Sequence, residues 1–114
     1  MATSPVQQII NSIQLANATA SLYQAPIGTW VQILSLKATN VDTVVHTVTF
    51  QIVPSSGTGT AANTSTKTLA ILPGNTYLGN NEYGLVLNPG DSIWGFADTA
   101  AVVNCFASGL LTLS

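Results

Sequence analysis

Turn-forming residues interrupt this chain about every 8 to 15 residues, and this spacing constrains the fold more than any other feature. Clear turn signals are Pro26 with Gly28, Pro73 with Gly74, and Pro89 with Gly90. Helical periodicity is hard to find between the turns, because β-branched residues dominate. The pattern predicts an all-β protein, an antiparallel β-sandwich of about eight strands. A jelly roll and an immunoglobulin-like sandwich both fit it.

Alternation of apolar and polar residues is clearest from Val44 to Val53, where His46 falls on the apolar side and Thr and Gln on the other. The preceding segment, 30–39, also has the composition of a strand, and we expect the two to form an antiparallel hairpin. The stretch from Pro54 to Thr66 has no aromatic and no charged residue, which predicts a long exposed loop or β excursion. Further strands are expected at 68–72, 83–87, 92–97 and 102–113.

The segment from Pro5 to Ala25 fits either a helix or an extended chain. Its apolar residues have the spacing of one helical face, whereas Asn11 and Ser12 favour extension. We interpret it as extended. One domain is expected over residues 1–114, with residues 1–20 forming either an N-terminal arm or the first strand, separated from the next strand by Pro26 and Gly28.

Charge is scarce in this chain. Two Lys and four Asp or Glu make up 5% of the residues, whereas an average soluble domain has about a quarter. Such a domain must cover its surface with uncharged polar side chains or with neighbouring subunits, so extensive subunit contacts are expected. A net charge of −2 with two basic residues offers little to neutralise a phosphate backbone, which argues against direct nucleic-acid binding.

Neither a membrane span nor a secretory signal is expected. No apolar run approaches the roughly 18 to 20 residues that cross a bilayer as a helix. Residues 1–11 lack the basic and apolar regions of a signal peptide. We therefore expect a chain made in a cytoplasm without export information.

The chain has few residues that could perform catalysis. His46 lies on the apolar face of its strand, where a hydrogen-bonded core histidine is a commoner outcome than a base or a metal ligand. Cys105 lies in an apolar run and is expected to be buried and inert, although a dyad with His46 stays open. Glu82, Asp91 and Asp98 lack the spacing of a calcium loop, and Asp91 is expected to bond backbone amides in its turn. We expect no enzyme activity, no cofactor and no metal site.

Aromatic and apolar residues supply the candidate interface. In segment 92–97, Trp94 and Phe96 face one side while smaller residues face the other, which suits a sandwich strand that also contacts a neighbouring chain. Trp30 is a further candidate for a subunit contact. The interface candidates are Val6, Ile9, Ile10, Ile13, Trp30, Trp94 and Phe96.

The segment from Tyr83 to Leu113 resembles a pattern in small virion proteins of tailed bacteriophages. Earlier, Thr47–Thr49 and Val53–Ser55 resemble the central strand and loop of the same proteins. Trp94, Cys105 and the N-terminal segment are not part of this pattern. The residues that carry it in the last third are Gly84, Leu85, Val86, Leu87, Gly90, Asp91, Ser92, Ile93, Ala97, Ala100, Val103, Asn104, Ser108 and Gly109.

The resemblance implies a β-sandwich subunit that assembles, often as a trimer, on a phage particle. We therefore expect a capsid decoration or cement protein, located in the virion, that stabilises the head by bridging subunits of the major capsid protein. Two alternatives are a neck, tail or fibre component and a carbohydrate-binding β domain that uses its tryptophans.

Overall fold

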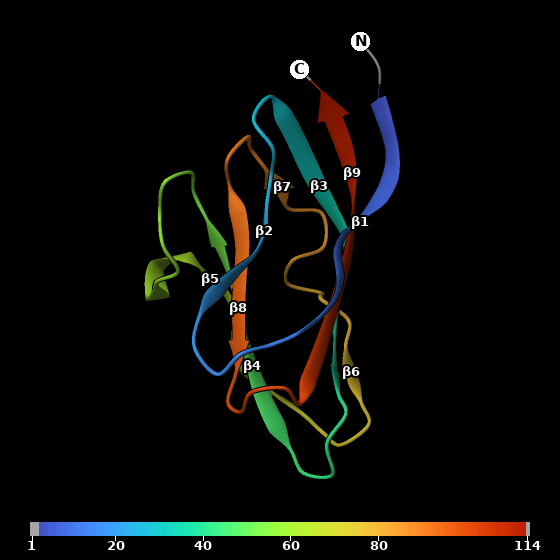
Figure 1. The fold of residues 1–114 in the computed structure, drawn as a ribbon, viewed down its shortest axis with the longest axis vertical. Coiled ribbons are helices and arrows are strands. Elements are labelled where there is room, and N and C mark those ends of the chain that lie inside the picture. Colours follow the sequence, from blue (N-terminus) through green and yellow to red (C-terminus); the bar gives the residue numbers. More distant parts are fainter. Residues whose placement is uncertain (1–2, 114) are drawn as a thin grey trace.

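A computed structural model describes residues 3–113 and shows two antiparallel β-sheets packed face to face (Figure 1). The predicted all-β sandwich is therefore confirmed. A single 3-10 turn, Ala61–Asn63, accompanies the strands in this part of the chain. The strands are β1 (Thr3–Gln14), β2 (Ala20–Gln24), β3 (Thr29–Asn40), β4 (His46–Val53), β5 (Thr64–Ile71), β6 (Thr76–Tyr77), β7 (Val86–Leu87), β8 (Ser92–Ala97) and β9 (Val103–Leu113).

The strand order is that of a jelly roll. Sheet A has the order β1-β9-β3-β6, with β7 also paired to β3, and sheet B has the order β2-β8-β4-β5. The first strand thus pairs with the last, and the second with the last but one. An immunoglobulin-like sandwich instead places its first two strands side by side in one sheet. Of the two predicted topologies, the structure has the first.

The N-terminal segment forms a strand, and the helical alternative is wrong. β1 pairs with β9 from Thr3 opposite Thr112 to Gln14 opposite Asn104. Three register shifts interrupt this pairing, and each disturbs the strict alternation of inward and outward residues. Ile9 and Ile10 are both buried for this reason. The helix-like spacing of apolar residues is therefore that of a bulged strand.

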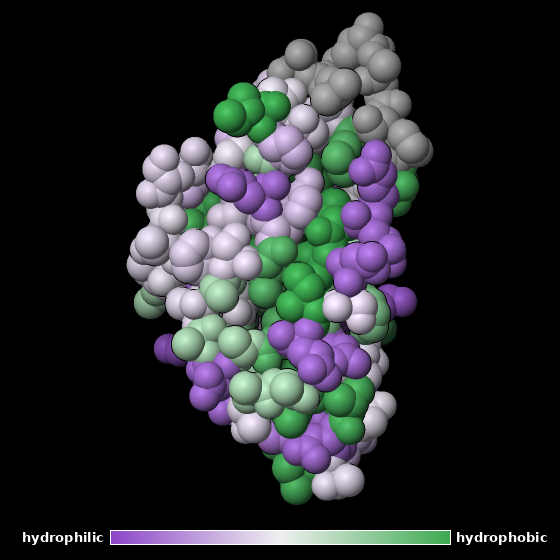
Figure 2. All heavy atoms as spheres, in the orientation of Figure 1, coloured by the Kyte–Doolittle hydropathy of each residue, from purple (hydrophilic) through white to green (hydrophobic). Residues whose placement is uncertain are grey.

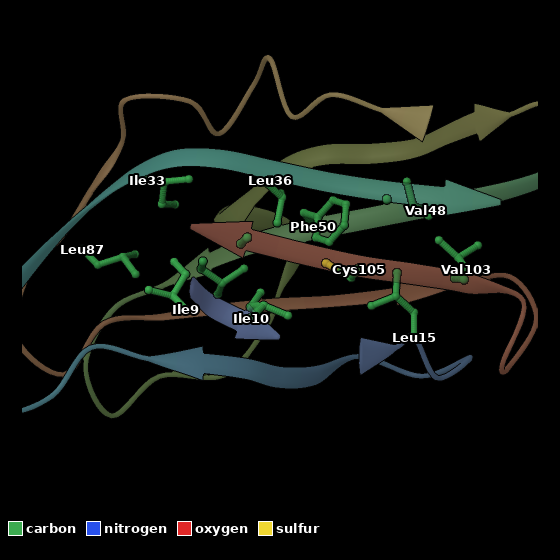
Figure 3. Close-up of a cluster of buried hydrophobic side chains, with 14 of the residues drawn as sticks. Ile9, Ile10, Leu15, Ile33, Leu36, Val48, Phe50, Leu87, Val103 and Cys105 are labelled. Carbon is green, nitrogen blue, oxygen red and sulfur yellow. The ribbon is translucent and has the colours of Figure 1, made fainter. Parts of the chain in front are cut away.

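The predicted hairpin between 30–39 and 44–53 is wrong. β3 lies in sheet A and β4 lies in sheet B, so the connection between them crosses from one sheet to the other. Both strands have one strongly apolar face, and these faces meet across the core instead of lying side by side. Figure 3 shows Leu36 of β3 beside Phe50 of β4, and both are fully buried.

The polar face of β4 is partly covered. Gln51 is buried, accepts a hydrogen bond from the Thr19 hydroxyl at 2.6 Å and donates one to the Thr60 carbonyl at 3.1 Å. The segment between Pro54 and Asn63 is mostly exposed, as predicted, and the bond to Thr60 ties it to the outer side of sheet B.

Several strand boundaries differ from the expected ones, including those of β3, which spans Thr29–Asn40, and β4, which begins at His46. The strand expected at 68–72 begins at Thr64, and the one expected at 83–87 contains only Val86 and Leu87. The one expected at 102–113 begins at Val103, while that at 92–97 has its predicted bounds. Asp91 accepts hydrogen bonds from the backbone amides of Asn88 and Ser55, both at 3.0 Å, so its predicted turn role is confirmed.

Candidate functional site

The structure separates the seven interface candidates. Ile9 and Ile10 belong to the buried core of this chain, so its own sheets cover them. Ile13 lies near the end of β1 and is partly exposed. Trp94 and Phe96 of β8 are half-buried on the outer side of sheet B, opposite the buried Ile93, as predicted from alternation.

Val6 and Trp30 lie on the outer face of sheet A, on either side of β9. Val6 is 55% exposed and pairs with Leu110, while Trp30 is 39% exposed and pairs with Thr112. Lys37 adds a positive charge to this face opposite the half-buried Phe106. The face is thus amphipathic.

Each sheet has one edge strand, β1 or β5, whose pairing is strongly irregular. β1 combines its three register shifts with Pro5, which has no backbone N–H to donate. β5 has two register shifts, an exposed Lys67, and Thr68 in the left-handed region at φ 49°. Bulges, Pro and Lys are the devices by which natural proteins prevent an edge strand from pairing with another chain. These features oppose pairing with a strand of another chain at β1 of sheet A and at β5 of sheet B.

A buried carboxylate connects the two sheets at the β5–β6 side. Glu82 is fully buried, and it accepts hydrogen bonds from the hydroxyls of Ser65 at 2.5 Å, Thr66 at 2.6 Å and Tyr77 at 2.7 Å. The Tyr77 ring stacks on Phe50 with 6.2 Å between ring centroids. Burial, with a smaller effect of the Glu82 carboxylate, raises the pKa of Tyr77. These contacts fix the 79–85 segment against β5.

Sequence reasoning treated Glu82 as one of three scattered carboxylates and missed this cluster. Its hydroxyl partners come from β5 and β6, 5 to 17 residues away along the chain. A Glu inside an Asn-rich turn carries no local signal of burial. The cluster could be predicted only from the topology, which places β6 at the edge of sheet A and β5 at the edge of sheet B.

A groove of 390 Å³ opens between β5 and β6. Its apolar lining includes Leu69, Leu72 and Leu78, which are 37%, 57% and 62% exposed. Tyr77, held by Glu82, lies in the same lining, and Asn75, Thr76 and Asn80 supply polar groups. None of the lining residues carries a formal charge.

The β3–β4 turn lies beside the groove at the end of β5. The Asn40 side chain donates to the carbonyl oxygens of Val44 at 2.8 Å and Ile71 at 2.9 Å, which holds the turn beside the end of β5. Val41, Val44 and Val45 on this turn are 54%, 55% and 46% exposed. We call Val41, Val44, Val45, Leu69, Leu72 and Leu78 the pole surface.

His46 is the predicted hydrogen-bonded core histidine. Its Nε2 lies 2.8 Å from Asp42 Oδ2 and its Nδ1 2.8 Å from Asp98 Oδ1. The hydrogen bond to Asp42, and then the one to Asp98, raises the pKa of His46. The hydrogen bond between Asp42 and His46 also lowers the pKa of Asp42. Both ring nitrogens are occupied by carboxylates, so the arrangement leaves neither nitrogen for Cys105. The cluster fastens the β3–β4 turn to the β8–β9 loop.

Cys105 lies inward on β9 and is fully buried, as predicted. Burial raises the pKa of its thiol to about 12. Within residues 3–113, no group of three or more His, Cys, Asp or Glu is arranged to hold a metal ion. The described residues also form no helix long and apolar enough to cross a membrane.

No protein-family model matches this chain, and no curated protein matches it. A solved structure is similar in fold: a chain described with the words "Bacillus endospore appendages form a novel family of disulfide-linked pili". Its TM-score is 0.57 at 19% sequence identity, over 100% of this chain and 93% of that chain. At this identity the likeness establishes a shared β-sandwich fold.

One chemical difference separates the two proteins. The appendage protein is described as disulfide-linked, whereas this chain has a single cysteine, enclosed by its own core. A disulfide between folded copies would require the buried sulfur of Cys105 to reach the surface. Burial of Cys105 thus opposes a disulfide between folded copies of this chain.

Proposed function

We propose that this chain is a structural subunit of an assembled particle or appendage, without enzyme activity or cofactor, and specifically a capsid decoration protein of a tailed phage. The observation that carries this proposal is the surface. Thirteen large apolar side chains in the described part of the chain are exposed, including the pole surface, Trp30 and Ile27, whereas the whole sequence has six charged residues. Such surfaces are typical of proteins that bind neighbours.

In this role the protein acts by covering surface. A standard interface buries about 800 Å² on each partner. The free chain exposes 5770 Å², so two such interfaces would cover about a quarter of it. One set of contacts would join copies of this chain, as a trimer, and another would join them to the major capsid protein in the virion. The summed contacts would hold capsid subunits together against internal pressure.

Two comparisons support a structural role. The sequence resembles small virion proteins of tailed phages from Tyr83 to Leu113, and the whole chain has the fold of an appendage protein. A jelly roll by itself serves many functions, so the surface and not the fold carries the argument. The full-length likeness to a pilus protein favours, as second candidate, a neck, tail or fibre component.

Quantitative mass spectrometry of purified particles tests the proposal. Hundreds of copies of this chain per particle are expected for a decoration protein, and removing it should lower the temperature at which heads release DNA. A handful of copies would reject decoration in favour of the neck, tail or fibre. Absence from particles would overturn the structural role itself.

A carbohydrate-binding role predicts a different result. Glycan-array binding by the free protein, abolished by Trp30→Ala or Trp94→Ala, would replace the structural proposal. Leu85→Ala is a matched control, because Leu85 and Trp30 are both 39% exposed. We expect no glycan binding by the wild type.

A further inference from the structure

The turn between β2 and β3 presents an apolar side chain to solvent. Ile27 is 97% exposed, while the neighbouring Ala25 and Thr29 are buried. The backbone N–H of Thr29 donates to the Pro26 carbonyl at 3.1 Å, and Gly28 has φ 77°. This is the hydrogen bond and the glycine position of a tight turn. Ile27 is therefore held outward by ordered backbone.

The pole surface lies at the other end of the molecule. Ile27 precedes the first residue of β3, whereas Thr76 and Tyr77 in the groove pair with Thr39 and Ala38 at its end. Twelve residues of β3 span roughly 36 Å at about 3.3 Å per residue, and the longest dimension of the molecule is 47 Å. Figure 1 shows the β2–β3 turn near the upper end and the β3–β4 turn at the lower end. Figure 2 shows apolar residues near both ends.

We propose that the β2–β3 turn of one copy docks, through Ile27, into the groove between β5 and β6 of the next copy. This inference rests on the proposed structural role and specifies how copies contact one another.

The two surfaces are complementary in chemistry. No residue of the turn from Pro26 to Thr29 and none of the groove lining carries a formal charge, so docking would bury no ion. The groove has a volume of 390 Å³ and is open to solvent, so a turn can enter it from outside. Leu72 and Leu78 would gain the apolar cover that they lack in the free chain.

The contact is heterologous, because the two partners contribute different surfaces. Each copy carries one turn and one groove, so the contact repeats from copy to copy and generates a ring if it closes and a row if it does not. One turn in one groove is smaller than a standard interface. The contact is therefore weak between free chains and is reinforced where other contacts already bring the turn of one copy close to the groove of the next.

Photo-cross-linking tests the geometry. A diazirine-bearing aliphatic amino acid at position 27 keeps the side chain apolar, and mixing with an isotope-labelled wild-type chain identifies cross-links between copies. After irradiation and proteolysis, mass spectrometry should place these cross-links at Leu69, Leu72 and Leu78. Leu72→Asp in the labelled chain should lower their yield about tenfold, the effect of about 1.4 kcal/mol. Val86→Asp is the matched control, because Leu72 and Val86 are 57% and 52% exposed.

Two results would overturn the inference. In the first, the cross-links are scattered over the surface or join two β2–β3 turns. In the second, Leu72→Asp leaves the yield of cross-links in the groove unchanged. Circular dichroism of each variant checks that it is folded. The outcomes are independent of the particle analysis. If the protein is abundant in particles but cross-links elsewhere, the proposed function stands and this contact is rejected. If it cross-links in the groove but is absent from particles, the contact stands and the proposed function is rejected.

Discussion

Replacing Glu82 with Gln tests whether the buried carboxylate stabilises the β5–β6 side of the sandwich. The wild-type carboxylate accepts three hydroxyl hydrogen bonds, two of them at Oε2 from Ser65 and Thr66. Glutamine has one acceptor oxygen and one NH2 group. If the amide oxygen takes the place of Oε2, the NH2 group faces the Tyr77 hydroxyl. If it takes the place of Oε1, the NH2 group faces the hydroxyls of Ser65 and Thr66.

The magnitude follows from these bonds. A hydrogen bond to a charged group contributes about 1.5 to 3 kcal/mol, and a neutral one about 1 kcal/mol. Ser65 can turn its hydroxyl to the Phe50 carbonyl, which lies at 3.3 Å. Glu82→Gln weakens the hydrogen bonds from Thr66 and Tyr77, but it also removes the cost of burying a charge. The expected net loss of unfolding free energy is about 2 kcal/mol. Glu82→Ala should lose about 4 kcal/mol, because it leaves the hydroxyls unpaired beside a cavity.

Urea denaturation followed by tryptophan fluorescence measures both variants. For a domain of this size, about 2 kcal/mol corresponds to a fall in melting temperature of roughly 8 °C. Thr66→Val is a matched control that removes one hydroxyl and keeps the carboxylate. A Glu82→Gln protein within about 0.5 kcal/mol of wild type would refute the claim that the charge on this carboxylate stabilises the fold.

Three further predictions concern the fold. His46 has a raised pKa in the native state, so its protonated form stabilises the fold below its unfolded pKa of 6.5, and this contribution is lost as pH rises through the native value. Urea midpoints of wild type and His46→Gln should therefore converge over that range, and a difference constant from pH 5 to 9 would contradict the ion pairs. Gly79 has φ 67° and a Cβ there would lie 2.3 Å from the Leu36 carbonyl oxygen, whereas Gly74 has φ 75° and open space around it. Gly74→Ala should cost about 1 kcal/mol for backbone strain, and Gly79→Ala at least about 2 kcal/mol more; equal losses of unfolding free energy would exclude the clash. Cys105, with a thiol pKa of about 12, should react with a thiol reagent at the rate of unfolding, and fast labelling of the native protein would show that the core opens.

Local patterns predicted the strands that obey simple alternation. Segment 92–97 alternates without interruption and became β8 with its predicted bounds. The N-terminal segment misled because bulges in β1 bury two consecutive residues, Ile9 and Ile10. A periodicity argument assumes an unbroken register, which a bulge removes.

The hairpin prediction failed for a different reason. A short polar connection between two strands is compatible both with a hairpin and with a crossing between sheets. The choice depends on tertiary contacts: Asn40 bonds to Ile71 and Val44, and His46 bonds to Asp42 and Asp98. These partners lie up to 52 residues apart in the sequence. Glu82 was missed on the same grounds, because its hydroxyl partners converge only in the folded chain.

Low charge predicted that neighbours cover this protein, and the fold determines where that can happen. The irregular edge strands β1 and β5 oppose extension of the sheets at those two edges, and the buried Cys105 opposes a disulfide between folded copies. The remaining contacts are exposed apolar side chains, such as Ile27 at one end and Leu72 at the other. Each contact of this kind is weak alone, so an assembly built from them would gain its stability from the number of contacts formed together. Such a subunit would bind firmly where its partners are already arrayed and weakly when free, as decoration of a preformed particle requires.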